Sequence, residues 1–287
     1  TATAFAEVGG QSFGVLAAAD SSTLSVVRLG SDGSLQLTDH VLDTRDTRFD
    51  GVHTIETASF NGRAYLAAAG GDDGVSVFEL LEDGRLLHLT TIADETGTTM
   101  SGVSALSFTL QGSALHLAVA SGAEAGLSVF TLDIASRGPI IGGTTAADVL
   151  DGGTGDDYLY GEAGNDAIAG HAGDDVIRDG AGLDVLTGGG GRDLFVLSDD
   201  GVIDTIADFD INQDRIDLSG WSFLRSNSQI LFQSTAEGGV ISFGAETLEL
   251  KTVDGSPLTI DQIQSLNLVG QSRFMPDWVL PDQPDSF

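Results

Sequence analysis

Residues 161–178 read GEAGNDAIAGHAGDDVIR, two copies of a nine-residue pattern, and this stretch decides the fold. The pattern runs through six consecutive rows from Gly143 to Val196. Its sixth position is aspartate in every row, its eighth is always Leu, Ile or Phe, and glycine recurs at positions one, two and four. A short pattern of fixed period predicts a solenoid of stacked coils.

Each row contains a turn followed by a short strand. The first six residues turn sharply, which favours glycine wherever the backbone needs a positive φ or a close approach. The last three residues form a strand whose apolar eighth position points inward. Two rows complete one coil, so alternate rows stack. This stacking predicts two columns of aspartates, one with Asp157, Asp175 and Asp193 and the other with Asp148, Asp166 and Asp184.

A column of carboxylates needs a cation between its members. Stacked strands lie about 4.8 Å apart, and two like charges at that distance repel by roughly 3.5 kcal/mol at an effective dielectric constant of about 20. Carboxylate and carbonyl oxygens form the hard ligand set that Ca²⁺ prefers. We therefore predict a calcium-dependent fold with several Ca²⁺ ions as cofactor. The alternative is a flexible, solvated linker, which gives no reason for an aliphatic residue two places after each aspartate.

The predicted calcium ligands lie in the second to sixth rows. They are the side chains of Asp157, Asp166, Asp175, Asp184 and Asp193, with the backbone carbonyls of Gly152, Gly153, Thr154, Gly155, Gly161, Ala163, Gly164, Gly170, Ala172 and Gly173. The first row departs from the pattern at Ala146, and the fifth begins with Asp179 and has Leu183 at its fifth position. Further candidates at the margins of the pattern are Asp148, Asp204, Asp208 and Asp214.

The nonapeptide rows resemble the RTX family, whose hemolysin-type repeats bind calcium in a parallel β-roll. The sequence continues as DTIADFD at 204–210 and DRIDLS at 214–219. These segments are similar to the one that closes the β-roll in the C-terminal domain of serralysin-type proteases. The open end of a solenoid exposes an unpaired edge, and we expect it to be capped by Ile206, Phe209, Ile216 and Leu218.

The rest of the C-terminal part has weaker signals. Strands are expected at 229–232, 239–243 and 247–250, and a short helix over 258–266 that starts at Thr259. The tail, with Pro276, Pro281 and Pro284, is expected to be extended.

Residues 1–138 carry a second repeat with a longer period. Alternating strands at 64–69, 74–80 and 86–92 have an earlier copy within 15–42 and a later copy within 115–132, and one more strand precedes each later copy, at 52–60 and 103–110. A spacing of 51 separates Gly33 from Gly84 and Gly51 from Gly102. Four strands per unit of about fifty residues is typical of a propeller blade, and the LSVF third strand resembles lactonase-type β-propellers. The alternative is an ordinary β-sandwich with accidental repetition.

The predicted fold is all-β and has three parts. Residues 1–138 form propeller-like four-stranded blades, 139–196 the RTX β-roll after a hinge at 136–139, and 197–287 a C-terminal β-sandwich cap and type I secretion region. About two and a half blades are present, whereas a propeller needs roughly four to eight. Either more blades precede Thr1 on a longer chain, or subunits pool their blades. The chain begins without methionine, so we expect a processed product or a segment of a longer chain.

The composition restricts the partners. The formal charge is −31, from 12 basic and 43 acidic residues. Nucleic acids and anionic membranes both reward clustered Lys and Arg, so neither is an expected partner. No run reaches the roughly 18 apolar residues of a membrane span. The chain has no cysteine, so an extracellular form must be stabilised by metal instead of disulfides.

Motifs for catalysis are weak. A zinc protease needs His-Glu-x-x-His on a helix, and none of the five histidines fits; His53, near Glu56, is the one candidate for a role. The GQSFG stretch at 10–14 has the spacing of a nucleophile elbow, but a strand is expected after Ser12 where that motif needs a helix. The paired carboxylates at 72–73 and 199–200 are interpreted as solvated loops. We predict no catalytic residue and leave enzymatic activity open.

Two functions follow from these observations. The first is a bacterial calcium-binding RTX protein, secreted or on the cell surface, whose blades serve in binding, self-association or contact with a larger protein. The family resemblance implies type I secretion with an uncleaved C-terminal signal. The second is the C-terminal fragment of a secreted β-propeller enzyme, a lactonase or a glycan-active protein, that carries RTX repeats as a secretion module.

Overall fold

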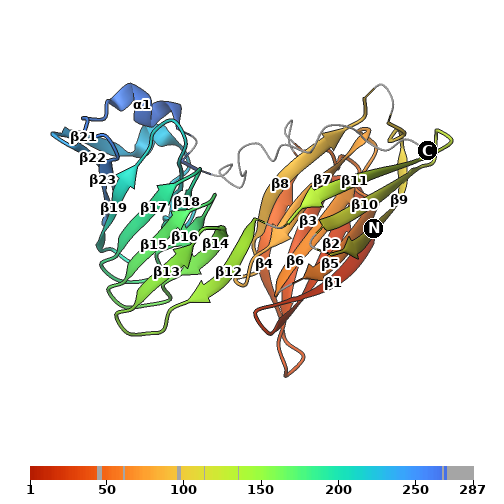
Figure 1. The fold of residues 1–287 in the computed structure, drawn as a ribbon, viewed down its shortest axis with the longest axis horizontal. Coiled ribbons are helices and arrows are strands. Elements are labelled where there is room, and N and C mark those ends of the chain that lie inside the picture. The colour runs from red at the N-terminus through yellow and green to blue at the C-terminus, as the bar shows by residue number, and fades with distance from the viewer. Residues whose placement is uncertain are drawn as a thin grey trace. The chain divides into compact units, whose positions relative to one another are not determined.

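The computed structural model describes residues 1–269 apart from 44–46, 61, 96–97, 113, 135 and 267. The chain divides into two compact units, Thr1–Ala135 and Ser136–Arg273 (Figure 1). Almost all of the regular secondary structure in both units is β-strand, which confirms the predicted all-β class. The predicted proline-containing tail lies outside the described residues.

The N-terminal unit contains three antiparallel sheets in which strands consecutive in sequence are neighbours. The first has β1 (Ala2–Val8), β2 (Gln11–Ala18), β3 (Thr23–Leu29) and β4 (Leu35–Leu42); the second β5 (Thr54–Phe60), β6 (Arg63–Ala69), β7 (Gly74–Leu80) and β8 (Leu86–Ala93); the third β9 (Val103–Gln111), β10 (Ala114–Ser121) and β11 (Leu127–Asp133). Strand β1 was not predicted. The third sheet has three strands because the next strand, β12 (Arg137–Gly142), joins a sheet of the second unit.

The 51-residue repeat extends to the loops that precede the second and third sheets. Asp43 Oδ1 accepts hydrogen bonds from Thr47 Oγ1 at 2.7 Å and from the backbone N–H of residue 49 at 3.1 Å. Asp94 Oδ1 accepts from Thr98 Oγ1 and from the N–H of residue 100 at the same two distances, 2.7 and 3.1 Å. The repeat therefore encodes one local structure that the chain uses twice.

The second sheet lies between the first and the third. Strand β1 runs beside β5, and β5 runs beside β9. Every residue of β6 and β7 is buried, whereas most residues of β4 and β9 are at least partly exposed. The middle sheet is thus covered on both faces and each outer sheet on one.

The second unit begins with a roll of two parallel sheets that take their strands from alternate rows. One sheet has the order β12-β14-β16-β18-β20, and the other contains β13-β15-β17-β19. The row strands are β13 (Val149–Gly153), β14 (Asp156–Tyr160), β15 (Ala167–Ala172), β16 (Val176–Arg178), β17 (Val185–Gly190) and β18 (Leu194–Val196). The predicted stacking of alternate rows is confirmed.

The register places the eighth positions directly over one another. Leu150 pairs with Ile168 and Ile168 with Leu186 in one sheet, and positions 159, 177 and 195 pair in the same way in the other. These six side chains are between 0% and 7% exposed and form the core of the roll.

The C-terminal segment continues both sheets. Strands β19 (Ile203–Phe209) and β20 (Arg215–Asp217) add one rung to each, and β23 (Glu246–Thr252) then pairs parallel to β19. Strands β21 (Leu231–Thr235) and β22 (Gly238–Phe243) complete the sheet in antiparallel order beyond β23. The expected cap residues are all buried in the same core as the rows: Ile206, Phe209, Ile216 and Leu218.

The predicted helix is α1 (Ile260–Ser265), and it starts where expected. Thr259 is its N-cap and forms a capping box with Gln262, whose side chain and backbone both bond to Thr259. A capping box satisfies backbone N–H groups that the first helical turn leaves without partners. The buried face of the helix is Ile263.

Candidate metal centre

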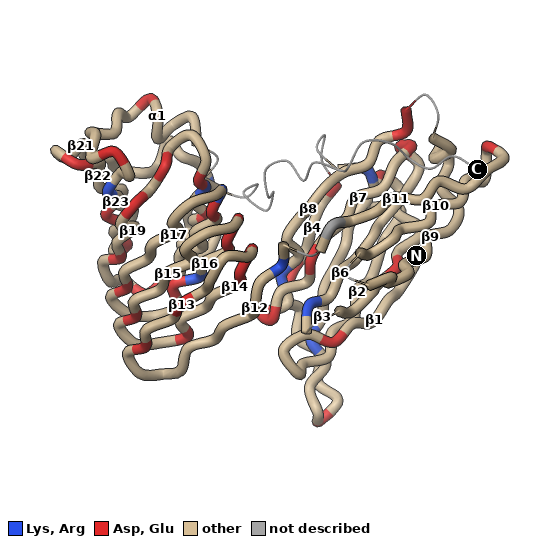
Figure 2. The backbone as a smooth tube through the Cα atoms, viewed as in Figure 1, with Lys and Arg blue, Asp and Glu red and all other residues tan. Residues whose placement is uncertain are grey.

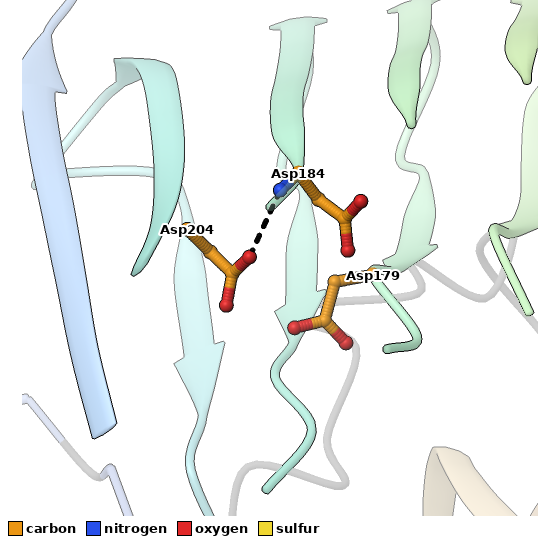
Figure 3. Close-up of side chains that lie close together, drawn as sticks. All are labelled: Asp179, Asp184 and Asp204. Carbon is orange, nitrogen blue, oxygen red and sulfur yellow. Dashed lines mark hydrogen bonds between the residues drawn. The ribbon is translucent and has the colours of Figure 1, made fainter. Parts of the chain in front are cut away.

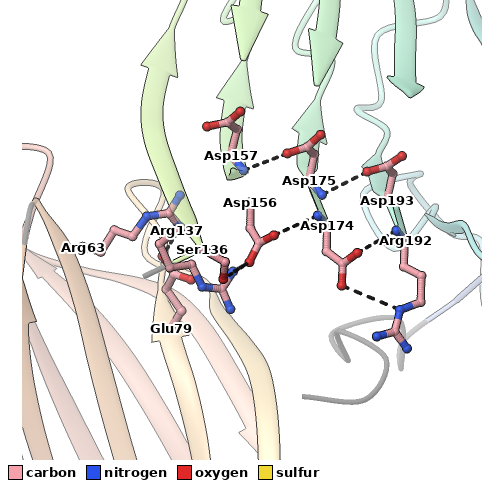
Figure 4. A network of polar contacts seen from close by, with 10 residues as sticks. All are labelled: Arg63, Glu79, Ser136, Arg137, Asp156, Asp157, Asp174, Asp175, Arg192 and Asp193. Carbon is pink, nitrogen blue, oxygen red and sulfur yellow. Dashed lines mark hydrogen bonds and ion pairs between the residues drawn. The ribbon is translucent and has the colours of Figure 1, made fainter. Parts of the chain in front are cut away.

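The aspartates at position six form one continuous ladder along each edge of the roll. On the edge that precedes β14, β16 and β18, the N–H of Asp157 donates to Asp175 Oδ1 at 2.8 Å and the N–H of Asp175 to Asp193 Oδ1 at 3.0 Å (Figure 4). The N–H of Asp193 then donates to Asp214 Oδ1 at 3.1 Å. One oxygen of each carboxylate thus links its row to the row one coil earlier.

The other edge has the same ladder. The N–H of Asp148 donates to Asp166 Oδ1 at 2.8 Å, that of Asp166 to Asp184 Oδ1 at 2.7 Å, and that of Asp184 to Asp204 Oδ1 at 3.0 Å. Asp204 and Asp214 therefore continue the two columns. Asp208 lies outside them and accepts the N–H groups of residues 188 and 189 at 2.9 and 2.8 Å.

The second oxygen of the ladder carboxylates is buried without a hydrogen-bond partner. Among the residues that the structure describes, this holds for Oδ2 of Asp166, Asp175, Asp184 and Asp193. These residues are between 0% and 2% exposed. A buried carboxylate oxygen without a partner costs several kcal/mol, so these atoms need a ligand that carries positive charge.

Glycine at position one creates the space in which such a ligand can sit. A Cβ on Gly152 would lie 2.5 Å from Asp157 Oδ2 and 2.6 Å from the carbonyl oxygen of Gly170. Gly161 and Gly170 have the same two neighbours, the aspartate Oδ2 of their own row and the carbonyl oxygen that begins the row one coil later. Carboxylate and carbonyl oxygens thus line this space, and such an all-oxygen ligand set suits Ca²⁺.

The other predicted carbonyl ligands lie in the same turns. Gly153 and Ala172 are the last residues of β13 and β15, and Thr154, Gly155 and Ala163 lie in the turns between strands. The fourth-position glycines Gly164 and Gly173 have φ of 127° and 125°, which L side chains rarely adopt. These glycines allow the turn to bring its carbonyls toward the aspartate.

Burial changes the titration of the ladder. Burial, aided by neighbouring carboxylates, raises the pKa of Asp193 to about 8, of Asp175 and Asp214 to about 7, of Asp204 to about 7 and of Asp184 to about 6. A nearby cation favours the ionised form and opposes this shift. The ladder is therefore a place where cations and protons compete.

A second ladder, at position five, was not predicted. The N–H of Asp174 donates to Asp156 Oδ1 at 3.0 Å, and the N–H of Arg192 donates to Asp174 Oδ1 at 2.8 Å (Figure 4). Arg137 lies 3.9 Å from Asp156, and Arg192 Nε lies 3.7 Å from Asp174 Oδ2. This column has an arginine at each end, so the chain itself supplies its countercharge.

Asp179 is a further buried acid that the sequence analysis treated only as an irregularity. It is 0% exposed, and its carboxylate accepts the N–H groups of Gly180 and Ser198. One oxygen each of Asp179, Asp184 and Asp204 lie within 4.8 Å of one another (Figure 3). The available signal was aspartate at a position that is glycine in every other row.

The remaining candidate residues have structural surroundings. His53 Nε2 bonds to the carbonyl oxygen of Val103 at 2.7 Å. Ser12 lies within strand β2, so the strand-to-helix turn of a nucleophile elbow is not present there. The interpretation of the paired carboxylates as solvated loops was wrong for one member of each pair, because Asp72 and Asp200 are half-buried. Burial raises the pKa of Asp72, and Asp200 accepts the N–H of residue 182.

A known family of repeats matches the rows of the roll. A family model described as RTX calcium-binding nonapeptide repeat matches residues 142–177 and 170–200. A solution structure of a subunit of the Azotobacter vinelandii mannuronan C5-epimerase is similar, with 24% identity, a TM-score of 0.31, and coverage of 50% of this chain and 93% of that one. The crystal structure of extracellular lipase LipA from Serratia marcescens is similar over 72% of this chain and 30% of that chain, with 20% identity and a TM-score of 0.36.

A search of curated protein sequences gives no match. Within the part of the chain that the structure describes, no helix is long and apolar enough to cross a bilayer. The family match, the nine-residue period and the two parallel sheets coincide over the same residues. Residues 142–200 are therefore calcium-binding RTX nonapeptide repeats.

Proposed function

We propose that this chain is a secreted calcium-binding protein whose roll folds around Ca²⁺ ions held along its two aspartate columns. The observation that carries the proposal is the set of buried Oδ2 atoms that have no hydrogen-bond partner among the described residues, at Asp166, Asp175, Asp184 and Asp193. Ca²⁺ between consecutive turns supplies the positive charge that lets these carboxylates remain ionised inside the protein.

The proposed ligands are drawn from both turns that flank each ion. The carboxylates are Asp157, Asp166, Asp175, Asp184 and Asp193, with Asp148, Asp204 and Asp214 at the ends of the columns, and the carbonyls are those of Gly152, Gly153, Thr154, Gly155, Gly161, Ala163, Gly164, Gly170, Ala172 and Gly173. Asp208 is assigned to the turn of residues 188 and 189 and not to an ion.

The experiment is far-UV circular dichroism and calcium titration of the full chain, with and without EGTA. We expect the strand signal of the roll to be lost in EGTA and to return with Ca²⁺. Asp175→Asn should weaken calcium binding by tenfold or more, because it removes one charge from the ladder. Asp151→Asn is the matched control, since the Asp151 side chain is 73% exposed and lies outside the columns. A fully structured roll in EGTA would contradict the proposal.

Secretion is the finer part of this proposal. A protein whose fold requires calcium is stable where calcium is millimolar, and extracellular calcium modules bind with Kd of about 10⁻⁴–10⁻³ M. The absence of cysteine leaves metal as the available stabiliser outside the cell. We assign residues 197–287 to the type I secretion region. A folding midpoint well below micromolar free Ca²⁺ would argue for a site of action inside the cell.

We further propose that the N-terminal unit associates with a second copy of the chain. The observation is the uncovered face of the first sheet, where Phe5, Leu16, Leu35 and Leu37 are between 40% and 69% exposed. In the middle of the unit, a sheet of the same repeat is covered on both faces by sheets of its own kind. Another such sheet is therefore the occupant that matches this face in shape and strand number.

Light scattering of the full chain in calcium tests this association. A dimer or larger assembly is expected at micromolar concentration, and Leu35→Ser with Leu37→Ser should shift it toward monomer. The control is Val149→Ser with Leu231→Ser, which removes two exposed apolar side chains from the second unit and should leave the association unchanged. A monomer at every concentration would contradict the proposal.

A further inference from the structure

The fifth row differs from the other five at the position that borders the metal space. Position one is glycine in those five rows, at 143, 152, 161, 170 and 188, but it is Asp179 in the fifth. At Gly152, Gly161 and Gly170 a Cβ would fill the oxygen-lined space beside the aspartate of the row. The fifth row places a real side chain at this position. Its Cβ takes the space that an ion would occupy beside a glycine, so an ion in this row must lie farther out, at the carboxylate in which the side chain ends.

The carboxylate of Asp179 turns toward two ladder aspartates. Asp179, Asp184 and Asp204 each contribute an oxygen to a group whose members lie within 4.8 Å of one another, and Figure 3 shows the three side chains close together. They come from the turn before β17 and from β19, and they are 0%, 0% and 5% exposed. The group is thus closed off from solvent.

A second observation points to a ligand in this group. Asp184 Oδ2 is buried and has no hydrogen-bond partner among the described residues. In contrast, both oxygens of Asp179 accept the N–H of Ser198 at 3.0 Å, and Asp204 Oδ1 accepts the N–H of Asp184 at 3.0 Å. Hydrogen bonds thus hold all three carboxylates in place, since Asp184 Oδ1 accepts the N–H of Asp166, and they leave Asp184 Oδ2 available for a ligand.

Three carboxylates at this spacing repel one another. Like charges repel more strongly in the protein interior than in water, because the effective dielectric constant is lower there. No ion pair joins any of the three to a basic side chain in the described part of the chain. A cation at the centre of the group reverses this balance, because it attracts all three charges at once.

We propose that Asp179, Asp184 and Asp204 form a three-carboxylate cation site that binds hard divalent and trivalent cations more tightly than the glycine-first turns of the roll. The number of charged ligands is one of the factors that set calcium affinity in oxygen sites. The site lies between the fifth row and β19, so its ion joins the repeats to the strand that pairs with β23. The inference rests on the proposed function, because it assumes that the roll takes up calcium.

The experiment is titration of the full chain with Ca²⁺ by calorimetry and with Tb³⁺ by luminescence. The wild-type chain is expected to bind one ion at least tenfold more tightly than the others, with a larger difference for Tb³⁺. Asp179→Asn keeps an oxygen to accept hydrogen bonds but removes the charge, and it should abolish the tight class while the other ions bind as before. Asp179→Gly restores the regular row and should give one class of equal sites.

The matched control is Asp199→Asn, which removes the same charge from an exposed residue five positions before Asp204 in the sequence. It should bind ions like the wild-type chain. Equal affinities and stoichiometry in wild-type, Asp179→Asn and Asp179→Gly chains would overturn the inference and leave Asp179 as a hydrogen-bond acceptor for Ser198. If Asp179→Asn does not fold in calcium, Asp179→Gly decides by the same titration. A wild-type chain that binds no ion would instead overturn the proposed function.

Discussion

The two units of the chain neutralise their buried charges in different ways. In the N-terminal unit, Arg63 and Glu79 are side by side at 2.6 Å with side chains 4% and 2% exposed. In the roll, the buried charged side chains are aspartates, and the second oxygens of four of them have no partner in the described part of the chain. One unit therefore contains its own countercharge, and the other requires countercharge from solution.

The difference extends to how each unit forms its core. Strands of the N-terminal sheets have seven to nine residues, and the middle sheet buries whole strands. Strands of the rows have three to six residues, and each contributes one apolar side chain to the core. A short strand buries little apolar surface, which is worth about 25 cal/mol per Å². Metal must therefore supply stability in the roll, where the strands bury little apolar surface.

Calcium removal should produce the largest difference in stability between the two units. Each ion at a hundred times its Kd adds about 2.7 kcal/mol to stability, so loss of several ions exceeds the stability of a typical domain. We expect hydrogen exchange of β13–β18 to become fast in EGTA while β5–β8 remain protected. Equal protection of both units in EGTA would remove the distinction between them.

Glu79→Gln should have the next largest effect, and it should lower the stability of the N-terminal unit. It leaves the buried charge of Arg63 without its counterion, which typically costs about 3–5 kcal/mol. Urea titration followed by hydrogen exchange of β6 and β7 measures the loss, and calcium should not reduce it. The control is Arg63→Met with Glu79→Gln, which should recover part of the stability because no unpaired charge remains. A calcium-dependent loss would show that the two units share one stabilising mechanism.

Gly170→Ala should remove a single ion from the roll. Its Cβ would overlap Asp175 Oδ2 and lie 2.9 Å from the carbonyl oxygen of Gly188, so it competes with the ion for the same space. We expect the stoichiometry to fall by one and the stability in excess calcium to fall by about 2.7 kcal/mol. Gly190→Ala is the control, because its Cβ would have no atom within 4 Å. Equal calcium titrations for the two variants would contradict the assigned position of the ion.

A change of pH should have the smallest effect on the stability of the roll, and the effect should have opposite signs in the presence and absence of calcium. The pKa values of Asp193 at about 8 and of Asp175, Asp204 and Asp214 at about 7 lie above the value near 4 of an unfolded aspartate. The folded roll therefore binds protons more tightly than the unfolded chain, and its metal-free stability is greatest below about pH 4 and is lost as the pH rises toward 8.

Calcium reverses this dependence because its ligands must be deprotonated. Below pH 7 we expect the Kd for calcium to rise by up to about tenfold per pH unit for each proton displaced. Circular dichroism in EGTA and calcium titrations between pH 5 and 8 measure the two trends. A roll that loses structure in EGTA as the pH falls would contradict the raised pKa values.

Much of the roll was predictable because its period is local. The spacing of nine fixes which residues turn, which point inward and which stack, so the columns through Asp157 and Asp166 and the core through Ile168 and Ile177 follow from counting. The helix start at Thr259 was predictable for the same reason, since a capping box involves residues three apart.

The rest depends on contacts that the local pattern does not encode. Strand β1 is rich in alanine, which is a weak signal for a strand. The pairing of β19 with β23 brings together residues more than forty positions apart after an antiparallel excursion through β21 and β22. The inward direction of Asp179 depends on the geometry of its turn, and in sequence it is only a missing glycine.

Because the rows alternate between two sheets, odd-numbered and even-numbered rows lie in different sheets. Hydrogen bonds along each ladder join residues 18 apart, the length of two rows. Duplication of a single row would move every later strand to the opposite sheet, so β19 and β20 would exchange sheets relative to the first rows. Duplication of two rows would keep every strand in its sheet and lengthen the roll by one coil. A change of eighteen residues therefore keeps every strand in its sheet, whereas a change of nine does not.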